Sequence, residues 1–574
     1  MARSSGMRFG VWSGIIGVFV FMMLLLGAAA PGHSTMLKVG LLSEPKTLNP
    51  FIASDKWARE VLRHLEMPLY IYEPEDISLV PWLADGQPEF SEDSKTVTVK
   101  LRDAKWSDGT PFTAEDILFT YQVVTELDIP RHRSRYSDVE KGEALDPHTV
   151  RYTMKKPEAS FQSRALVALI VQKKYWAPVV EKAKKSENPL SFITSYNCDD
   201  APTLGPFLLS KWTRGSSILL LKNKNFFGTG MKFGDLVIGP YIDGILFKFY
   251  GNADAGILAL KKGDVDFIGW SISPGYLQDL EKDPQIKIFT NTKSGFIYIG
   301  FNCHEKPFSY PEFRQAVAYL INKEFLVKRV LQGMGSARNS IIPPGNKFWY
   351  NPDLPAYGAG EPDAVRVKKA YDLLKNAGWT WQVPPIDESG KIQKAKGLTM
   401  PDGQVVGQFD LLTPPADYDP NRAISAMLIS EWMNNFGIPV VARPMAFSAM
   451  LQKVKSERNF EMFILGYGFI QPDPDIMRSF FSSKSDRKNG RNLTGFNDKE
   501  YDKLAEESSA TINPEKRREI IFKLEEIIAG QVPMIPIFTP SEIEAVRKDK
   551  FTGWVSTQDG IGNLWSYLVL KPVK

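Results

Sequence analysis

Two residues of the chain have the spacing of a nucleophilic enzyme. Ser43 and Lys46 form an S-x-x-K pattern, in which a lysine can activate a serine hydroxyl. Pro45 lies between them in a loop-like stretch, and no K-T-G triad, the partner motif of such enzymes, occurs in the chain. We therefore interpret this pattern as a chance match.

Other catalytic and cofactor motifs are also missing from the sequence. It contains no G-x-S-x-G, no H-E-x-x-H and no phosphate-cradling G-x-x-x-x-G-K. The five histidines show no pair at metal-ligand spacing; they are His33, His64, His132, His148 and His304. We predict that the protein is not an enzyme and that it carries no metal and no cofactor.

Length and composition indicate an ordinary folded protein with several domains. The 574 residues suggest roughly three domains, and 43% apolar with 24% charged residues is a globular balance. The net charge is +4, of which Arg3 and Arg8 at the N-terminus supply two. The remainder is nearly neutral, which argues against a nucleic-acid partner.

The first 30 residues have the pattern of an export signal. Arg3 and Arg8 precede an apolar stretch at 11–26, and Ala28, Ala29 and Ala30 supply a small-residue cleavage site. We expect residues 1–30 to be a signal peptide and the mature protein to be periplasmic. An uncut leader acting as a membrane anchor is the alternative. No cysteine lies near the cleavage site, so a lipoprotein is not expected.

The chain has only two cysteines, Cys198 and Cys303. In an exported protein they could form one disulfide, whereas two buried thiols are the other interpretation and the one we prefer.

Strand and helix patterns alternate along the rest of the chain, which predicts a mixed α/β fold. We expect strands at 37–42, 95–101, 149–154, 217–221, 245–249, 296–301, 409–412, 438–442 and 462–466. We expect helices at 254–261, 363–376 and 425–436, one beginning at Pro311, and one after Asn513 and Pro514. The strands at 95–101 and 149–154 should pair, and residues 381–407 have the composition of an exposed insertion.

The segment 106–124, WSDGTPFTAEDILFTYQVV, predicts a tight turn followed by a helix. Asp108 and Gly109 favour the turn, and Thr113 is typical of a helix N-cap. Glu115 and Asp116 then occupy the first helical turn, where negative charge is favourable.

This segment resembles a signature of the family 5 extracellular solute-binding proteins, which include the periplasmic oligopeptide- and dipeptide-binding proteins of ABC importers. Four more segments resemble the same family, in the same order along the chain. They are 38–50 (KVGLLSEPKTLNP), 203–212 (TLGPFLLSKW), 300–323 (ending in FRQAVAYLINK) and 464–481, which carries Asp473, Pro474 and Asp475.

The resemblance implies a periplasmic-binding-protein-like clamp of two lobes with an additional domain. Domain I would comprise residues 36–68, 203–290 and 536–574, the accessory domain II residues 69–202, and domain III residues 291–535. The protein would close around a peptide or peptide-like solute and deliver it, as a monomer, to an ABC permease. A carbohydrate or another uncharged solute on the same fold is the alternative.

The resemblance also locates the ligand-binding region. The family's acidic residue for the peptide amine falls on Ile470, and a basic residue for the carboxylate falls on Ile464, so both charges are missing here. Lys455 matches a position that is basic in some members. We therefore expect a site of rings and neutral polar groups that includes Tyr467, Phe469, Gln471, Tyr298 and Asn302, with Lys455 for a negative charge. Tyr298 and Phe469 could instead be core residues, and Asn302 a strand-bridging amide.

Overall fold

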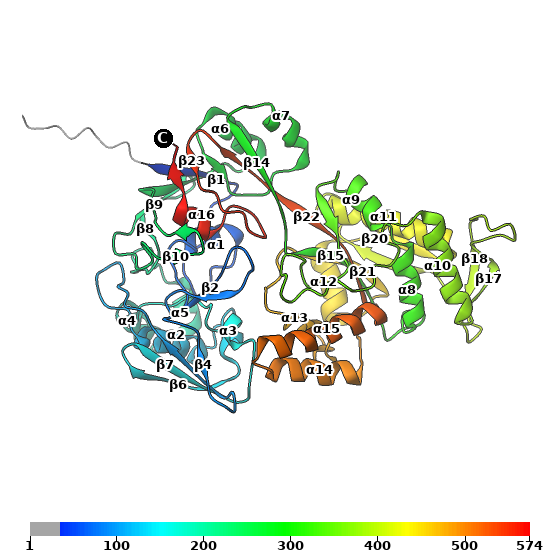
Figure 1. Ribbon diagram of the computed structural model, residues 1–574, viewed down its shortest axis with the longest axis horizontal. Coiled ribbons are helices and arrows are strands. Elements are labelled where there is room, and N and C mark those ends of the chain that lie inside the picture. The colour runs from blue at the N-terminus through cyan, green and yellow to red at the C-terminus, as the bar shows by residue number, and fades with distance from the viewer. Residues whose placement is uncertain (1–34, 574) are drawn as a thin grey trace, which may run out of the picture. The chain divides into compact units, whose positions relative to one another are not determined.

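The fold is described from a computed structural model of residues 35–573. The expected signal peptide, residues 1–30, lies outside these described residues. Within residues 35–573, no helix combines the length and apolar character needed to cross a membrane. Helices and strands alternate along the chain, so the predicted mixed α/β class is confirmed (Figure 1).

The largest sheet has twelve strands, ten of which follow the order β20-β19-β21-β15-β22-β13-β1-β12-β9-β8. Their bounds are β1 Met36–Leu41, β8 Phe207–Thr213, β9 Ser217–Lys222, β12 Gly244–Phe249, β13 Phe267–Ile268, β15 Phe296–Phe301, β19 Phe409–Thr413, β20 Val440–Pro444, β21 Met462–Tyr467 and β22 Met534–Arg547. The other two, β14 (Ile286–Thr292) and β16 (Gly335–Ala337), also pair with β22. Parallel β12 and β13 flank β1, whose Leu37, Val39 and Leu41 are fully buried.

Strand β22 lies in the middle of this sheet and joins its two halves. Its C-terminal half pairs with β14 and β13, and its N-terminal half pairs with β15 and β16. Strand β14 is followed directly by β15, so Thr292 lies opposite Ser541 and Ile297 opposite Phe538. Two adjacent chain segments therefore cross between the two groups of strands, as the red strand β22 shows in Figure 1.

A separate sheet has the order β4-β5-β7-β6 and packs with helix α2 in one hydrophobic cluster. Its strands are β4 Glu89–Phe90, β5 Thr96–Lys100, β6 Val139–Asp146 and β7 Thr149–Met154. The predicted pairing of β5 with β7 is confirmed. Around it lie the hairpin β2 (Tyr70–Tyr72) with β3 (Leu79–Pro81), and helices α2 Ala114–Glu126, α3 Phe161–Arg164, α4 Lys173–Lys184 and α5 Pro189–Ser195. Helix α1 (Lys56–Leu62) packs instead in the hydrophobic cluster of β1.

The buried carboxylate of Asp116 organises the turn before α2. It accepts hydrogen bonds from the N–H of Thr113 (3.0 Å), from Nε1 of Trp106 (3.1 Å) and from the N–H of Lys173 (2.8 Å). Thr113 is the N-cap of α2, as its sequence position predicts. One side chain thus ties the turn, the helix and the start of α4 together.

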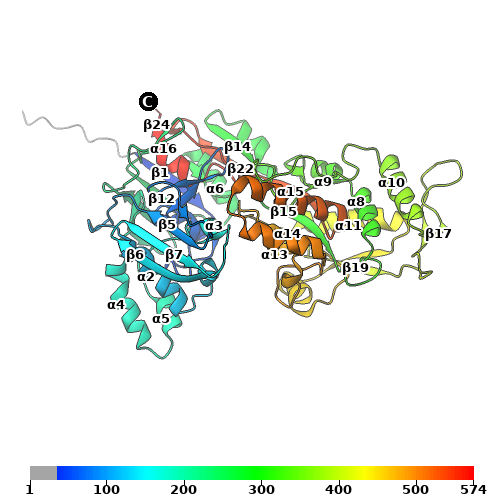
Figure 2. The same ribbon diagram turned by 60° about the horizontal axis from the view of Figure 1, so that its bottom comes forward.

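Helices cover the strands from β15 onwards. They are α8 Pro311–Leu320, α9 Lys323–Arg329, α10 Asp363–Asn376, α11 Pro420–Asn435, α12 Phe447–Leu451, α13 Ile476–Phe481, α14 Lys499–Ala510 and α15 Pro514–Gln531. Figures 1 and 2 both show α14 and α15 side by side, and Asn513 caps α15 by accepting from the N–H of Lys516. The remaining helices, α6 Ala253–Lys262, α7 Leu277–Glu281 and α16 Leu564–Val569, accompany the strands near β1.

Two predicted segments were wrong in detail. Residues 381–407 are not merely an insertion, because β17 (Thr380–Val383) and β18 (Lys396–Thr399) form a hairpin whose Leu398 is fully buried. Helix α11 begins at Pro420, since Asp419 caps its N-terminus by accepting from the N–H of Arg422. Cys198 and Cys303 are both free thiols, which was the preferred interpretation.

Candidate functional site

Residues 469–473 follow β21 and border three cavities of about 290, 390 and 450 Å³. Phe469, Ile470 and Gln471 line both the 290 and the 450 Å³ cavities. Pro472 lines the 390 and 450 Å³ cavities, and Asp473 the 290 and 390 Å³ cavities. The three cavities therefore share this segment as a common wall, and we call them together the cleft.

The opposite wall of the cleft comes mainly from residues 68–167. The 290 Å³ cavity is lined there by Arg131, Ser134, Arg135, Ser160, Ser163 and Arg164. The 450 Å³ cavity is lined by the β2–β3 hairpin, including Tyr70, Ile71, Tyr72, Glu73 and Ile77, and by residues 557–565 near the C-terminus. Segments from both ends of the chain thus converge on residues 469–473.

Tyr467 places its aromatic ring at the edge of the cleft. It lies at the end of β21 and lines the 290 Å³ cavity. Its ring stacks on Tyr298 with centroids 5.8 Å apart and planes 5° apart, and it also contacts Phe480 at 4.9 Å. Tyr298 is only 1% exposed and does not line the cleft, so its place is behind Tyr467 as a support.

Phe469 and Gln471 are the exposed members of the segment. The Phe469 side chain is 52% exposed beside the cavities that it lines, which is unusual for a large apolar ring. The neighbouring Ile470 is buried, and its N–H donates to Oγ of Ser294 at 3.2 Å. Exposed and buried side chains therefore alternate here, and a ligand would meet Phe469 and Gln471.

The other two expected site residues lie away from the cleft. Asn302 ends β15 on its far side, where its buried amide donates to the carbonyl of Phe460 at 3.0 Å. It borders a different cavity, together with Lys306 and Arg458. Lys455 belongs to the helical turn Gln452–Glu457, and its carbonyl accepts from the N–H of Asn489. Neither residue lines any of the three cavities of the cleft.

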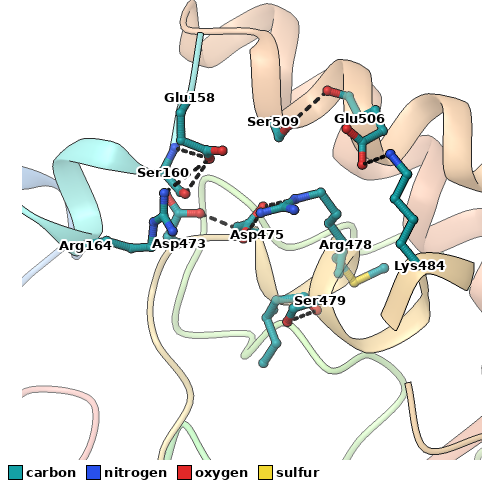
Figure 3. Close-up of polar contacts among 12 residues, drawn as sticks. Glu158, Ser160, Arg164, Asp473, Asp475, Arg478, Ser479, Lys484, Glu506 and Ser509 are labelled. Carbon is teal, nitrogen blue, oxygen red and sulfur yellow. Dashed lines mark hydrogen bonds and ion pairs between the residues drawn. The ribbon is translucent and has the colours of Figure 1, made fainter. Parts of the chain in front are cut away.

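A polar network ties residues 158–164 to the segment around Asp473 (Figure 3). Asp473 accepts two hydrogen bonds from Arg517, at 2.9 and 3.1 Å, and one from Oγ of Ser163 at 2.8 Å. Asp475 forms a two-pronged pair with Arg478 at 2.7 and 2.8 Å. The N–H of Ala159 donates to the carbonyl of Ser509 at 2.7 Å.

Within this network, the charge of Asp473 is compensated by Arg517. Burial raises the pKa of Asp473, but the adjacent Arg517 guanidinium and its hydrogen bonds outweigh burial and hold that pKa below its ordinary value. Asp473 is therefore ionised at neutral pH and already has its cation. It is not free to bind a charged ligand.

Three cleft residues were missed by the sequence analysis: Tyr72, Arg135 and Asp559. Each is an isolated polar residue in an irregular or short segment, and only the fold brings them to one cavity. Arg135 belongs to the 3₁₀ helix Arg133–Tyr136, and Asp559 to a tight turn after β23 (Phe551–Thr552). We find no pattern in the sequence that would have singled them out.

A fold in which two chain crossings join two groups of strands beside a cleft is the architecture of a clamp-type solute-binding protein. The model for bacterial extracellular solute-binding proteins, family 5, matches residues 78–489, so the chain belongs to this family. The family resemblance and the fold class expected from the sequence are thereby confirmed.

Individual relatives agree with this assignment. The oligopeptide-binding protein AppA of Bacillus subtilis is 24% identical over 91% of this chain and 89% of its own length. Di/tripeptide-binding protein 1 of Pseudomonas aeruginosa is 26% identical over 82% of each chain. The structure of HbpA2 from Haemophilus parasuis, 20% identical, superposes over 94% of this chain and all of its own with a TM-score of 0.75.

Proposed function

We propose that this protein is the extracytoplasmic solute-binding component of an ABC importer and that it binds a peptide in the cleft along residues 469–473. The observation that carries the proposal is the shared wall formed by this segment, with Phe469 and Gln471 exposed on it. An extended peptide presents alternating side chains and backbone amides. The aromatic rings of the cleft can pack against the side chains, and exposed amides can form hydrogen bonds with the peptide backbone. The names of the curated relatives, oligopeptide- and di/tripeptide-binding proteins, support the peptide.

The expected division into three domains fits this role. Domain I would hold β1, β12 and the C-terminal half of β22, and domain III would hold β15 and the N-terminal half of β22. The β14–β15 and β22 crossings near Thr292 and Thr539 would then form the hinge. Ligand contacts with both walls would favour the closed form over the open one.

The free energy that favours the closed form must come from contacts with the ligand. A micromolar dissociation constant corresponds to about 8 kcal/mol of net binding free energy. The gross contact energy has to exceed this, because ordering of the peptide and the loss of its free motion oppose binding. The closed protein would then dock, as a monomer, on a permease in the inner membrane.

The proposal includes export through the N-terminal leader. Mass spectrometry of the N-terminus of the exported protein tests this part. A mature chain beginning at Pro31 is expected, and an intact leader would instead support the membrane-anchored alternative.

Thermal unfolding in the presence of ligands tests the substrate class. A mixture of short peptides should raise the melting temperature in a concentration-dependent way, whereas cello- and manno-oligosaccharides should not. The reverse result would reject the peptide and favour the uncharged solute. Native mass spectrometry of freshly purified protein provides a second readout, since a retained ligand would appear as a mass increment.

A further inference from the structure

Two groups of opposite charge face the 450 Å³ cavity without an ion pair. Arg135 and Asp559 both line this cavity, and neither forms a salt bridge with any residue of the described chain. They also form none with one another. Charged groups that line a cavity without an ion pair keep hydrogen-bonding capacity that a ligand of opposite charge can use.

Arg135 extends from the 3₁₀ helix into the cleft. One of its terminal nitrogens, Nη1, donates to the carbonyl of Arg164 at 2.6 Å, which fixes the guanidinium in place. Burial lowers the pKa of Arg135, and the neighbouring groups that oppose this shift are the side chains of Tyr136 and Tyr72. The guanidinium remains a cation with donors left over for an anion.

The hydroxyl of Tyr72 lies on the same wall. It is buried and has no hydrogen-bond partner in the described structure, although Tyr72 lines the 450 Å³ cavity. The backbone is held, because the Tyr72 carbonyl accepts from Nε1 of Trp565 at 2.9 Å. Buried hydroxyls are nearly always hydrogen-bonded, so an unpartnered one beside Arg135 indicates a missing acceptor.

Asp559 reaches the cavity from the C-terminal part of the chain. Its turn is rigid: the Thr557 N–H and Nδ2 of Asn563 both donate to the carbonyl of Gly560. Oδ1 of Asp559 accepts from the N–H of Ser294 at 2.8 Å, and Oγ of Ser294 accepts from the N–H of Ile470. A carboxylate from a distant segment is thus held beside Ile470, whose own side chain is apolar.

We propose that the 450 Å³ cavity binds a zwitterion, with its ammonium group on Asp559 and its carboxylate on Arg135 and the Tyr72 hydroxyl. Glu73 also lines this cavity, and one of its carboxylate oxygens, Oε2, already accepts from the N–H groups of Glu75 and Asp76 at 2.8 and 2.9 Å. This inference rests on the proposed function and specifies that both peptide ends are recognised, at positions other than Ile470 and Ile464. Since Asp559 contacts Ser294 between β14 and β15, the ammonium would be bound next to the two strand crossings.

Capped ligands test the proposal without altering the protein. Three equimolar mixtures of di- to pentapeptides are prepared, one with free ends, one N-acetylated and one C-amidated. Each mixture is titrated separately against the wild-type protein by calorimetry and thermal shift. We expect each cap to weaken binding by about tenfold to a hundredfold, the effect of losing one charged hydrogen-bond partner.

Two variants then assign each end to its residue. Asp559→Asn should weaken binding of free peptides and abolish the penalty of N-acetylation, while amidation stays harmful. Arg135→Gln should show the opposite pattern. Asp128→Asn and Arg133→Gln, whose side chains pair with one another outside the lining of the cavity, serve as matched controls and should bind free peptides as the wild type does.

The outcomes separate this inference from the proposed function. If free peptides bind the wild type but both caps and both variants change affinity less than about twofold, recognition of the ends is rejected while the peptide function stands. If no peptide form binds the wild type, the proposed function fails and the inference fails with it.

Discussion

Oγ of Ser163 donates a 2.8 Å hydrogen bond to Asp473, although 310 positions separate the two residues in the chain. The bond connects α3 with the segment that forms the common wall of the cleft. Residues 156–163 are also tied to α14 by the Ala159–Ser509 backbone hydrogen bond and by the Lys156–Glu506 ion pair. Ligand binding and the balance of charge around Asp473 are therefore linked through the same loop.

Loss of the Arg517–Asp473 ion pair should lower the free energy of unfolding more than loss of any other polar contact of this wall. Arg517→Met would leave the buried carboxylate without its cation and should cost about 3–5 kcal/mol in the free energy of unfolding. Lys100→Met, which removes the exposed pair with Glu89, is the control and should leave the free energy of unfolding nearly unchanged. Urea unfolding of both variants measures the difference, and equal effects would contradict this assignment.

The same pair predicts how stability responds to acid. Because the folded-state pKa of Asp473 is depressed, its contribution is fully present above the ordinary aspartate pKa of 3.8 and is lost as the pH falls through the lower folded value. Arg517→Met should remove this part of the acid dependence. Stability curves of the wild type and the variant should therefore converge as the pH approaches the folded pKa, and parallel curves would reject the linkage.

Glu525 should produce a pH dependence of the opposite sign. Burial raises its pKa from 4.5 to about 8, despite hydrogen bonds from Ser340 and from the N–H of Asn351. Its protonated form is favoured in the folded state, so its contribution is complete below pH 4.5 and declines as the pH rises through about 8.

Glu525→Gln should flatten this decline, because the amide can keep both contacts without a charge. At pH near 8 the variant should be more stable than the wild type by a few kcal/mol at most, since one pKa unit corresponds to about 1.4 kcal/mol. Glu519→Gln, on the exposed face of α15, should change nothing. Chemical unfolding at several pH values makes the comparison, and a variant less stable at every pH would refute it.

Tyr467 should contribute to ligand affinity through its ring rather than its hydroxyl. Tyr467→Ala removes the ring that stacks on Tyr298 and should weaken peptide binding by about tenfold. Tyr467→Phe keeps the ring, so its affinity should stay within about twofold of the wild type. Calorimetry measures both affinities. Full affinity in the alanine variant would exclude Tyr467 from the site.

Both cysteines should be unreactive in the folded protein. Burial raises the pKa of Cys198 to about 12 and that of Cys303 to about 11, so little thiolate forms at neutral pH. Labelling with a chromogenic disulfide reagent should be slow for native protein and should reach two thiols per chain after denaturation. Fewer than two thiols under non-reducing denaturation would reveal a disulfide.

Local elements were largely predictable because short-range chemistry specifies them. Thr113, with an acid three positions later, marks a helix start in any context, and the alternating residues of β5 and β7 mark paired strands. The two errors have different causes. Burial of Leu398 in β18 depends on packing partners far away in the sequence, whereas the start of α11 at Pro420 follows from the local Asp419 cap, a signal that the sequence itself carries.

The residues of the ligand site were harder to predict from the sequence than the helices and strands. The segment around Phe469 and Gln471 was found through motifs, and it does border the cleft. Asn302 lies at the other end of β15, because position along a strand decides which end of the sheet a side chain reaches. Tyr298 is covered by Tyr467, and burial of one ring behind another has no signature in a single strand.

The sequence by itself determined the class of protein and the order of its elements, and it predicted the segment that borders the cleft. Those properties follow from local propensity and from motifs that are continuous in the chain. Only the tertiary structure decided which charges are compensated. Asp473 is satisfied by Arg517, whereas Arg135 and Asp559 face one cavity unpaired. Electrostatic energy depends on distance in space, and folding alone brings these four charged residues to the same cleft.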